Sequence, residues 1–115
     1  MVKRVYTDYI QDILDSINDI EHFVHGMTFH EFKIYRKTAN AVVRSIEIIG
    51  EASKKIPKSI RDSQPDIPWK KMAGIRDKLT HEYFGIDLEI IWKVATEEIY
   101  MLKPGIQHIL EKLQE

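Results

Sequence analysis

The stretch YTDYIQDILDSINDIEHFV, from Tyr6 to Val24, sets the expectation for the whole fold. Its apolar side chains recur at steps of three and four residues, the spacing of one face of an α-helix. These side chains are Tyr6, Tyr9, Ile10, Ile13, Leu14, Ile17, Ile20 and Val24. The pattern predicts a long amphipathic helix that places Tyr6 and Tyr9 in the core. We expect it to end near His25-Gly26, because glycine readily adopts the left-handed conformation found at many helix ends.

A second helix is expected to begin at the sequence Thr28-Phe-His-Glu31. This is a capping box, in which the hydroxyl and the carboxylate satisfy the free amides of a helix start. Apolar residues at helical spacing follow it, namely Ala39, Val42, Val43, Ile46, Ile49 and Ala52. The pattern predicts one long helix that runs to a boundary at Lys54-Lys55-Ile56-Pro57.

Two further helices are expected after a proline-containing break at residues 63–68, which predicts a loop with at most a short helix. A third apolar stripe consists of Trp69, Met72, Ile75 and Leu79, and Gly85 marks its end. Asp87 is a natural N-cap for the last helix. That helix carries Ile91, Val94, Ile99, Leu102, Ile106, Ile109 and Leu113. Pro104-Gly105 should kink it or split off its last turns.

The length of 115 residues is that of one domain, which we take to span residues 1–115. No segment alternates apolar and polar residues in the manner of a half-buried strand. The sequence therefore predicts an all-α, up-and-down bundle of four to five helices.

The composition also restricts the class of protein. The chain has no cysteine, which excludes disulfides and thiolate metal sites and fits a reducing compartment. Its first residues, MVKRVYTDYI, lack the apolar run of a signal peptide, and no window approaches the length of a membrane span. We expect a soluble, cytoplasmic protein with no membrane partner.

The net charge of −1 excludes a domain that coats nucleic acid through overall positive charge. Two local basic clusters do occur: Lys54, Lys55, Lys58 and Arg61 form the first, and Lys70, Lys71, Arg76 and Lys78 form the second. A solvated, lysine-rich face is one interpretation of them. The other is a local contact with RNA, for which Lys70, Lys71 and Lys78 are the candidates.

The sequence RDKLTHEY, from Arg76 to Tyr83, places a run of charged and polar side chains at the end of the third apolar stripe. On a helix, position 81 lies about 140° from Arg76 and away from the apolar stripe. One interpretation is structural: a surface His81 held by Asp77, and an Arg76 that forms a salt bridge with a neighbouring helix. The angular separation of positions 76 and 81 does not exclude this structural interpretation.

The same residues also suit the cleavage of a phosphodiester. Histidine exchanges protons near neutral pH, so His81 could act on a ribose 2′-hydroxyl or on a leaving oxygen. Arginine stays charged, so Arg76 could hold a phosphate through two donors and stabilise the charge that develops on it. With the 2′-hydroxyl as internal nucleophile, RNA could be cut without a metal, whereas DNA could not be cut by this route.

The run Arg76-Asp-Lys-Leu-Thr-His81-Glu-Tyr83 resembles the R-X4-6-H motif of the HEPN superfamily, in the R-X4-H-X-Y form of the HepT-like toxins, formerly called domain of unknown function 86. The likeness extends over nearly the whole chain. Three more stretches look like that family: SIEIIGEASKKI (Ser45 to Ile56), IPWKKMAGIRDKLTHEYFGID (Ile67 to Asp87) and IIW (Ile90 to Trp92).

This resemblance implies a dimeric RNase toxin of a bacterial or archaeal toxin–antitoxin pair, with RNA as substrate and a small MntA-like nucleotidyltransferase as antitoxin. It matches Arg76 and His81 to the catalytic pair, and Asp77 to the polar residue that commonly follows the arginine. It matches Tyr83 to the tyrosine that the antitoxin modifies with AMP, which silences the toxin. We therefore expect a metal-independent endoribonuclease that needs no cofactor.

A different class of function also fits the chain: a non-catalytic helical module that docks on a nucleotidyltransferase or presents a substrate to it. The presence of both Arg76 and His81, together with the polar Asp77, favours the enzyme over this module.

Other polar residues give weaker signals. His22, His25 and His30 include no pair four residues apart, so exposed histidines at helix ends are the better interpretation than a metal site. Glu47 and Glu51 lie one helical turn apart, and a solvated edge or a salt bridge to Arg44 accounts for them.

Overall fold

The structure is a computed structural model that describes residues 5–81 and 87–114, with residues 76–81 described by their backbone alone. All regular elements in these ranges are helical, as expected. They are α1 (Tyr6–Val24), α2 (Phe29–Ile34), α3 (Arg36–Ser53), α4 (Lys58–Ser63), α5 (Trp69–His81), α6 (Leu88–Lys93), the π-helical segment η2 (Val94–Glu98) and α7 (Ile99–Leu113). None of these described helices has the length and apolar character needed to cross a membrane.

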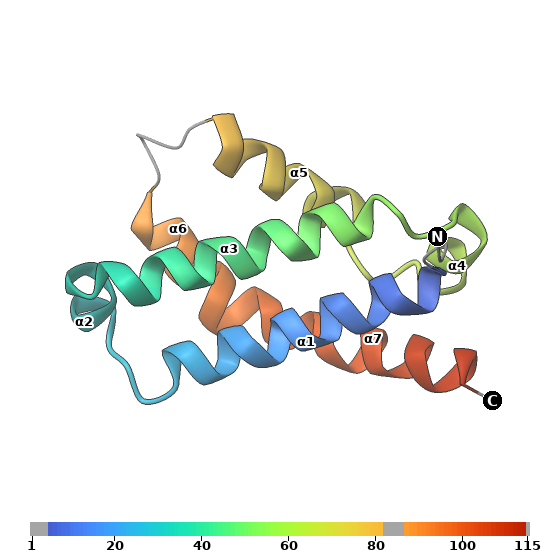
Figure 1. The fold of residues 1–115 in the computed structure, drawn as a ribbon, viewed down its shortest axis with the longest axis horizontal. Helices are drawn as coiled ribbons and strands as arrows, with labels where there is room; N and C mark the ends of the chain where they lie inside the picture. Colours follow the sequence, from blue (N-terminus) through green and yellow to red (C-terminus); the bar gives the residue numbers. More distant parts are fainter. Residues whose placement is uncertain (1–4, 82–86, 115) are drawn as a thin grey trace.

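The long helices run up and down, as the sequence predicted (Figure 1). Helix α1 packs against α3 and α7, and α5 packs mainly against α3. Helix α5 therefore lies at the outside of the bundle. The continuous run of α6, η2 and α7 crosses back over the bundle and packs against α1, whereas α5 packs on α3 (Figure 1). With this run counted as one helix, the described chain forms six helices rather than four or five, because the short α2 and α4 were not expected as separate elements.

The core is built from the predicted apolar stripes. Ile10, Ile13, Ile17 and Ile20 of α1 are fully buried. Such burial stabilises the fold by about 1.5–3 kcal/mol for each large apolar side chain. The expectation for Tyr6 is wrong, since it is 41% exposed as the first residue of α1, where a helix end has fewer neighbours. Tyr9, one turn later, does pack against the core.

The connection from α1 to α2 follows the sequence signals. Gly26 has a φ of 71°, the left-handed conformation expected after α1. The capping box is also present: the amide of Glu31 donates to Thr28 Oγ1 at 3.2 Å, and the amide of Thr28 donates to Glu31 Oε1 at 3.0 Å. These two contacts satisfy two of the free amides at the start of α2.

The single long helix expected after this box is wrong, because the chain breaks at Tyr35 into α2 and α3. The break allows α2 to leave the axis of α3 and to bury Phe32 completely. The ring of Phe32 lies 5.1 Å from the ring of Trp92 in α6, and that of Phe29 lies 6.1 Å away. Aromatic packing across the fold thus overrides the local helical pattern.

The last helix begins as predicted, and of the two outcomes expected at Pro104-Gly105, a kink or a split, the split does not occur. The Asp87 side chain accepts a hydrogen bond from the amide of Glu89 at 2.9 Å. Pro104 does not split α7, because Leu102 and Ile106 on either side of it stay buried in the same core. The irregular segment is instead η2, where the amide of Ile99 bonds to the carbonyl of Val94.

Gly105 is required by close packing between α7 and the loop before α5. A β-carbon at this position would lie 2.8 Å from Ile67 Cδ1 and 2.9 Å from its Cγ1. Ile67 is itself buried and has little room to move. We predict that Gly105→Ala lowers the free energy of unfolding by about 1–3 kcal/mol, measured by urea denaturation.

Gly74 of α5 provides the matched control for this prediction. It is exposed, and a β-carbon there meets no atom within 4 Å. Gly74→Ala should therefore raise the free energy of unfolding by about 0.5–1 kcal/mol, the usual gain in a helix interior. Equal stability of the two variants would contradict the close contact at Gly105.

Candidate active site

The candidate catalytic residues are carried by α5, which is fixed in the core at its start. Trp69 and Met72 are buried, and Trp69 Nε1 donates to the carbonyl of Gln64 at 3.1 Å. The helix then continues without a break to His81, so Arg76, Asp77 and His81 belong to its second half. The side chains of residues 76–81 lie outside the described part of the chain, as does Tyr83 altogether.

The register of α5 separates a core face from an exposed face. Met72 is buried and Ile75 is half-buried, whereas Lys70 and Gly74 are exposed. Positions 70, 74, 77 and 81 recur at steps of three and four residues, so they share one side of the α-helix backbone, the side that carries the exposed Lys70 and Gly74. The backbone of α5 is helical through position 81, and the side on which the His81 side chain lies stays a prediction.

The three lysines expected to bind RNA differ in their surroundings. Lys70 is exposed and has no ion pair with any other described residue. Lys71 Nζ lies 2.8 Å from Glu98 Oε1 in η2, so its charge already has a partner. The Lys78 side chain lies outside the described part. No local signal could have predicted the Lys71–Glu98 pair, because its members are 27 residues apart in sequence.

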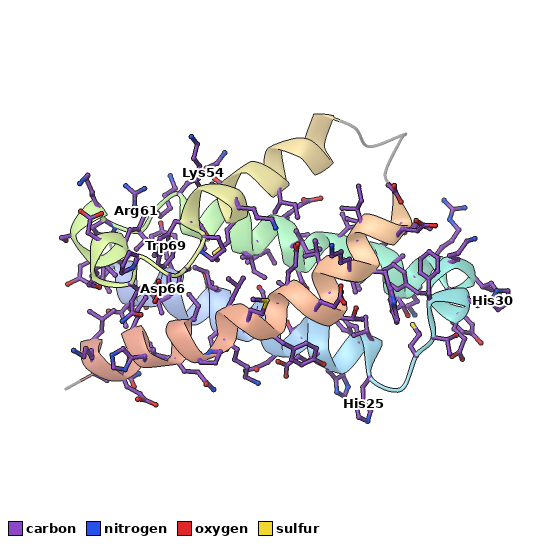
Figure 2. The ribbon with its side chains drawn as sticks, turned by 180° about the vertical axis from the view of Figure 1, so that it is seen from behind. His25, His30, Lys54, Arg61, Asp66 and Trp69 are labelled. Carbon is purple, nitrogen blue, oxygen red and sulfur yellow. The ribbon has the colours of Figure 1, made fainter. Side chains whose placement is uncertain are left out.

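The structure also places one residue of the first basic cluster close to two residues of the second, which the sequence did not indicate. A broad hollow of about 930 Å³ at the start of α5 is lined by Arg61 of α4 and by Lys70 and Lys71 of α5. Figure 2 shows Arg61, Lys54 and Trp69 at this same end of the molecule. The carboxylate of Asp62 also lines the hollow.

The weaker candidates have structural explanations. His22, His25 and His30 are all exposed, as expected, and Figure 2 shows His25 and His30 on separate parts of the surface. Within the described ranges, no group of three or more histidine or acidic side chains could hold a metal. Glu47 Oε2 lies 3.6 Å from Arg44 Nη1, which confirms the expected salt bridge.

Comparison with known proteins identifies the class of this helical bundle. The family model described as Ribonuclease HepT-like matches residues 13–109. The chain therefore belongs to the HepT-like ribonuclease family.

Relatives over the full length support this assignment. A protein of Thermococcus cleftensis, named probable ribonuclease HepT, is 44% identical over 98% of this chain and 99% of its own length. A protein of Methanocaldococcus jannaschii, named only provisionally as an RNase, is 44% identical over 100% of this chain and 99% of its own length. A relative in Caldanaerobacter subterraneus, also provisionally named an RNase, is 42% identical over 90% of this chain and 93% of its own. No solved structure matches the chain.

Proposed function

We propose that this protein is a metal-independent endoribonuclease in which Arg76, Asp77 and His81 form the catalytic set. The observation that carries the proposal is membership of the HepT-like ribonuclease family, with R-X4-H-X-Y present in the chain. The name of the Thermococcus relative, probable ribonuclease HepT, supports the same activity. The position of these residues on one exposed outer helix is compatible with access by a long substrate.

The proposed reaction uses the substrate's own 2′-hydroxyl as nucleophile. A base removes the proton of this hydroxyl, a bond forms between the 2′-oxygen and phosphorus, and the bond from phosphorus to the 5′-oxygen breaks. An acid gives a proton to the departing 5′-oxygen, which leaves a 2′,3′-cyclic phosphate. His81 exchanges one of these protons, and Arg76 binds the phosphate oxygens, whose negative charge it stabilises. Asp77 orients the set.

The test of this function is a cleavage assay with purified protein. A fluorescent single-stranded RNA should be cut equally well with and without a chelator. The same RNA with a 2′-deoxy sugar at the cleaved position should resist, because it lacks the nucleophile. Cleavage that stops when the chelator is added would contradict the metal-independent mechanism.

We further propose that the protein is the toxin of a toxin–antitoxin pair and that it acts as a homodimer. Expression without its nucleotidyltransferase partner should then arrest growth. The dimer is proposed because positions five residues apart on an α-helix lie about 140° apart around its axis. Arg76 and His81 of one chain therefore cannot easily hold the same phosphate, whereas two copies of the outer helix α5 could supply one residue each.

Silencing is proposed to occur by AMP addition to Tyr83. The phenolic oxygen would accept the adenylyl group, and the added negative charge and base would repel and block RNA close to His81. We predict that Tyr83→Phe remains folded but is no longer modified by the partner and ATP, as measured by intact mass. Tyr100→Phe, which changes an exposed tyrosine of α7, serves as the control and should still be modified. Undiminished AMP addition to the Tyr83→Phe variant would place the acceptor elsewhere.

A further inference from the structure

The hollow at the start of α5 contains cations whose charge is not used within the described fold. Arg61 and Lys70 are both exposed, and neither has an ion pair with another described residue. Two other charged residues that line the hollow are paired: Asp62 pairs with Lys58 at 2.9 Å, and Lys71 pairs with Glu98 at 2.8 Å. The hollow thus presents to an anion two positive charges, from two different helices, that have no partner among the described residues.

The floor of the hollow indicates which part of a nucleic acid it fits. Trp69 is 8% exposed, and its indole N–H already donates to the carbonyl of Gln64. It therefore offers neither a ring face on which a base could stack nor a free donor that could read a base edge. A surface with free cations and no stacking aromatic contacts the phosphate backbone and does not select sequence.

Lys70, which lines the hollow, lies on the same side of the α5 backbone as the proposed catalytic position 81. Eleven residues of α-helix separate the two positions by about 16 Å along the axis. A few nucleotides of single-stranded RNA can span this distance. A strand that passes position 81 along this face therefore leads directly to Lys70 and Arg61.

Gly74 lies between the two ends of this path. Glycine in a helix interior lowers helix stability. No close packing within the described structure requires it, because a β-carbon there meets no atom within 4 Å. A residue without a side chain on an exposed face allows the backbone of a ligand to approach the helix closely.

We propose that this face is a phosphate track: RNA bound at position 81 continues over Gly74 of α5, and its backbone phosphates are held by Lys70 and by Arg61 of α4. The track rests on the proposed ribonuclease function, which it extends by naming where the substrate runs beyond the cut. It accounts for RNA binding by a chain whose net charge is −1. Because the track contacts backbone phosphates, we expect it to bind RNA regardless of the RNA sequence.

The test is RNA binding by full-length protein that carries His81→Ala to prevent cleavage. Fluorescence anisotropy with a labelled single-stranded RNA is measured over a range of salt concentrations. Each phosphate contact with a single strand contributes about 0.7 to the slope of log K against log salt concentration. Because Arg61→Gln/Lys70→Gln removes two such contacts, we expect the magnitude of this slope to fall by about 1.4. The affinity at low salt should fall accordingly.

The matched control is Arg36→Gln/Lys37→Gln, which removes one arginine and one lysine that are also exposed. These residues begin α3, at the end of the bundle opposite to α4 (Figure 1). The control should retain the parental slope. A slope that is equal in the two double variants would overturn the track. Loss of binding to the nucleotidyltransferase, with RNA binding intact, would also overturn it and would assign the hollow to a protein partner.

The close approach at Gly74 is tested separately with Gly74→Leu. The variant should fold, because the position is exposed and leucine favours a helix. It should bind RNA more weakly than Gly74→Ala does, and equal binding by the two would remove Gly74 from the track. Binding is measured apart from cleavage. If wild-type protein does not cut RNA although the binding results are as expected, the proposed ribonuclease function is refuted and the phosphate track is retained.

Discussion

Replacing His81 with alanine should lower the rate of RNA cleavage by about 10²–10⁴-fold, the usual contribution of a general acid–base group. The loss is expected because no other side chain of the R-X4-H-X-Y sequence exchanges protons near neutral pH. Single-turnover cleavage of a labelled RNA by purified protein measures it directly. Growth arrest on expression without the partner should disappear in parallel.

The control for this experiment is His30→Ala, which removes an exposed histidine of α2 that lies outside the R-X4-H-X-Y sequence. Circular dichroism and thermal unfolding should show that both variants are folded. Toxicity and cleavage that persist in His81→Ala would refute the catalytic role of the motif. Purified wild-type protein that neither cuts RNA nor arrests growth would instead fit the alternative class, a non-catalytic helical partner of a nucleotidyltransferase.

The long helices could be predicted because their pattern is local. The spacing of the isoleucines in α1 and the capping box of Thr28 and Glu31 depend only on residues a few positions apart, and both are present in the structure. The break at Tyr35 could not be predicted in the same way. It depends on Phe32 packing against Trp92, which is 60 residues later in the chain. The π-helical turn of η2 also has no local sequence signal that we can name.

The same distinction applies to the candidate site. The common side of α5 that Lys70, Gly74 and position 81 share follows from helical register alone. The surroundings of the lysines and of Arg61, by contrast, do not follow from helical register. Lys71 looked like an equal member of its basic cluster, yet Glu98 of η2 pairs with it. Arg61 and Lys70 looked like parts of separate clusters, yet α4 and α5 place them in one hollow.

The dimer proposal leads to the second large effect, the rescue of two inactive variants by each other. Arg76→Ala and His81→Ala should each form an inactive homodimer. If Arg76 of one subunit acts with His81 of the other, a mixed dimer contains one site with both residues and one site with neither. Random reassociation of equal amounts makes about half of the dimers mixed, so about a quarter of the wild-type activity should return.

Helix α5 is suited to such a shared site, because it lies at the outside of the bundle and packs mainly on α3. The measurement is RNA cleavage after the two variants are unfolded together and refolded, with mixed dimers quantified by native mass spectrometry. Each variant refolded alone is the control and should remain inactive. If the mixture stays inactive although mixed dimers are present, Arg76 and His81 act within one chain or all four residues are needed together. Either result would exclude two independent sites that each consist of one subunit's arginine and its partner's histidine.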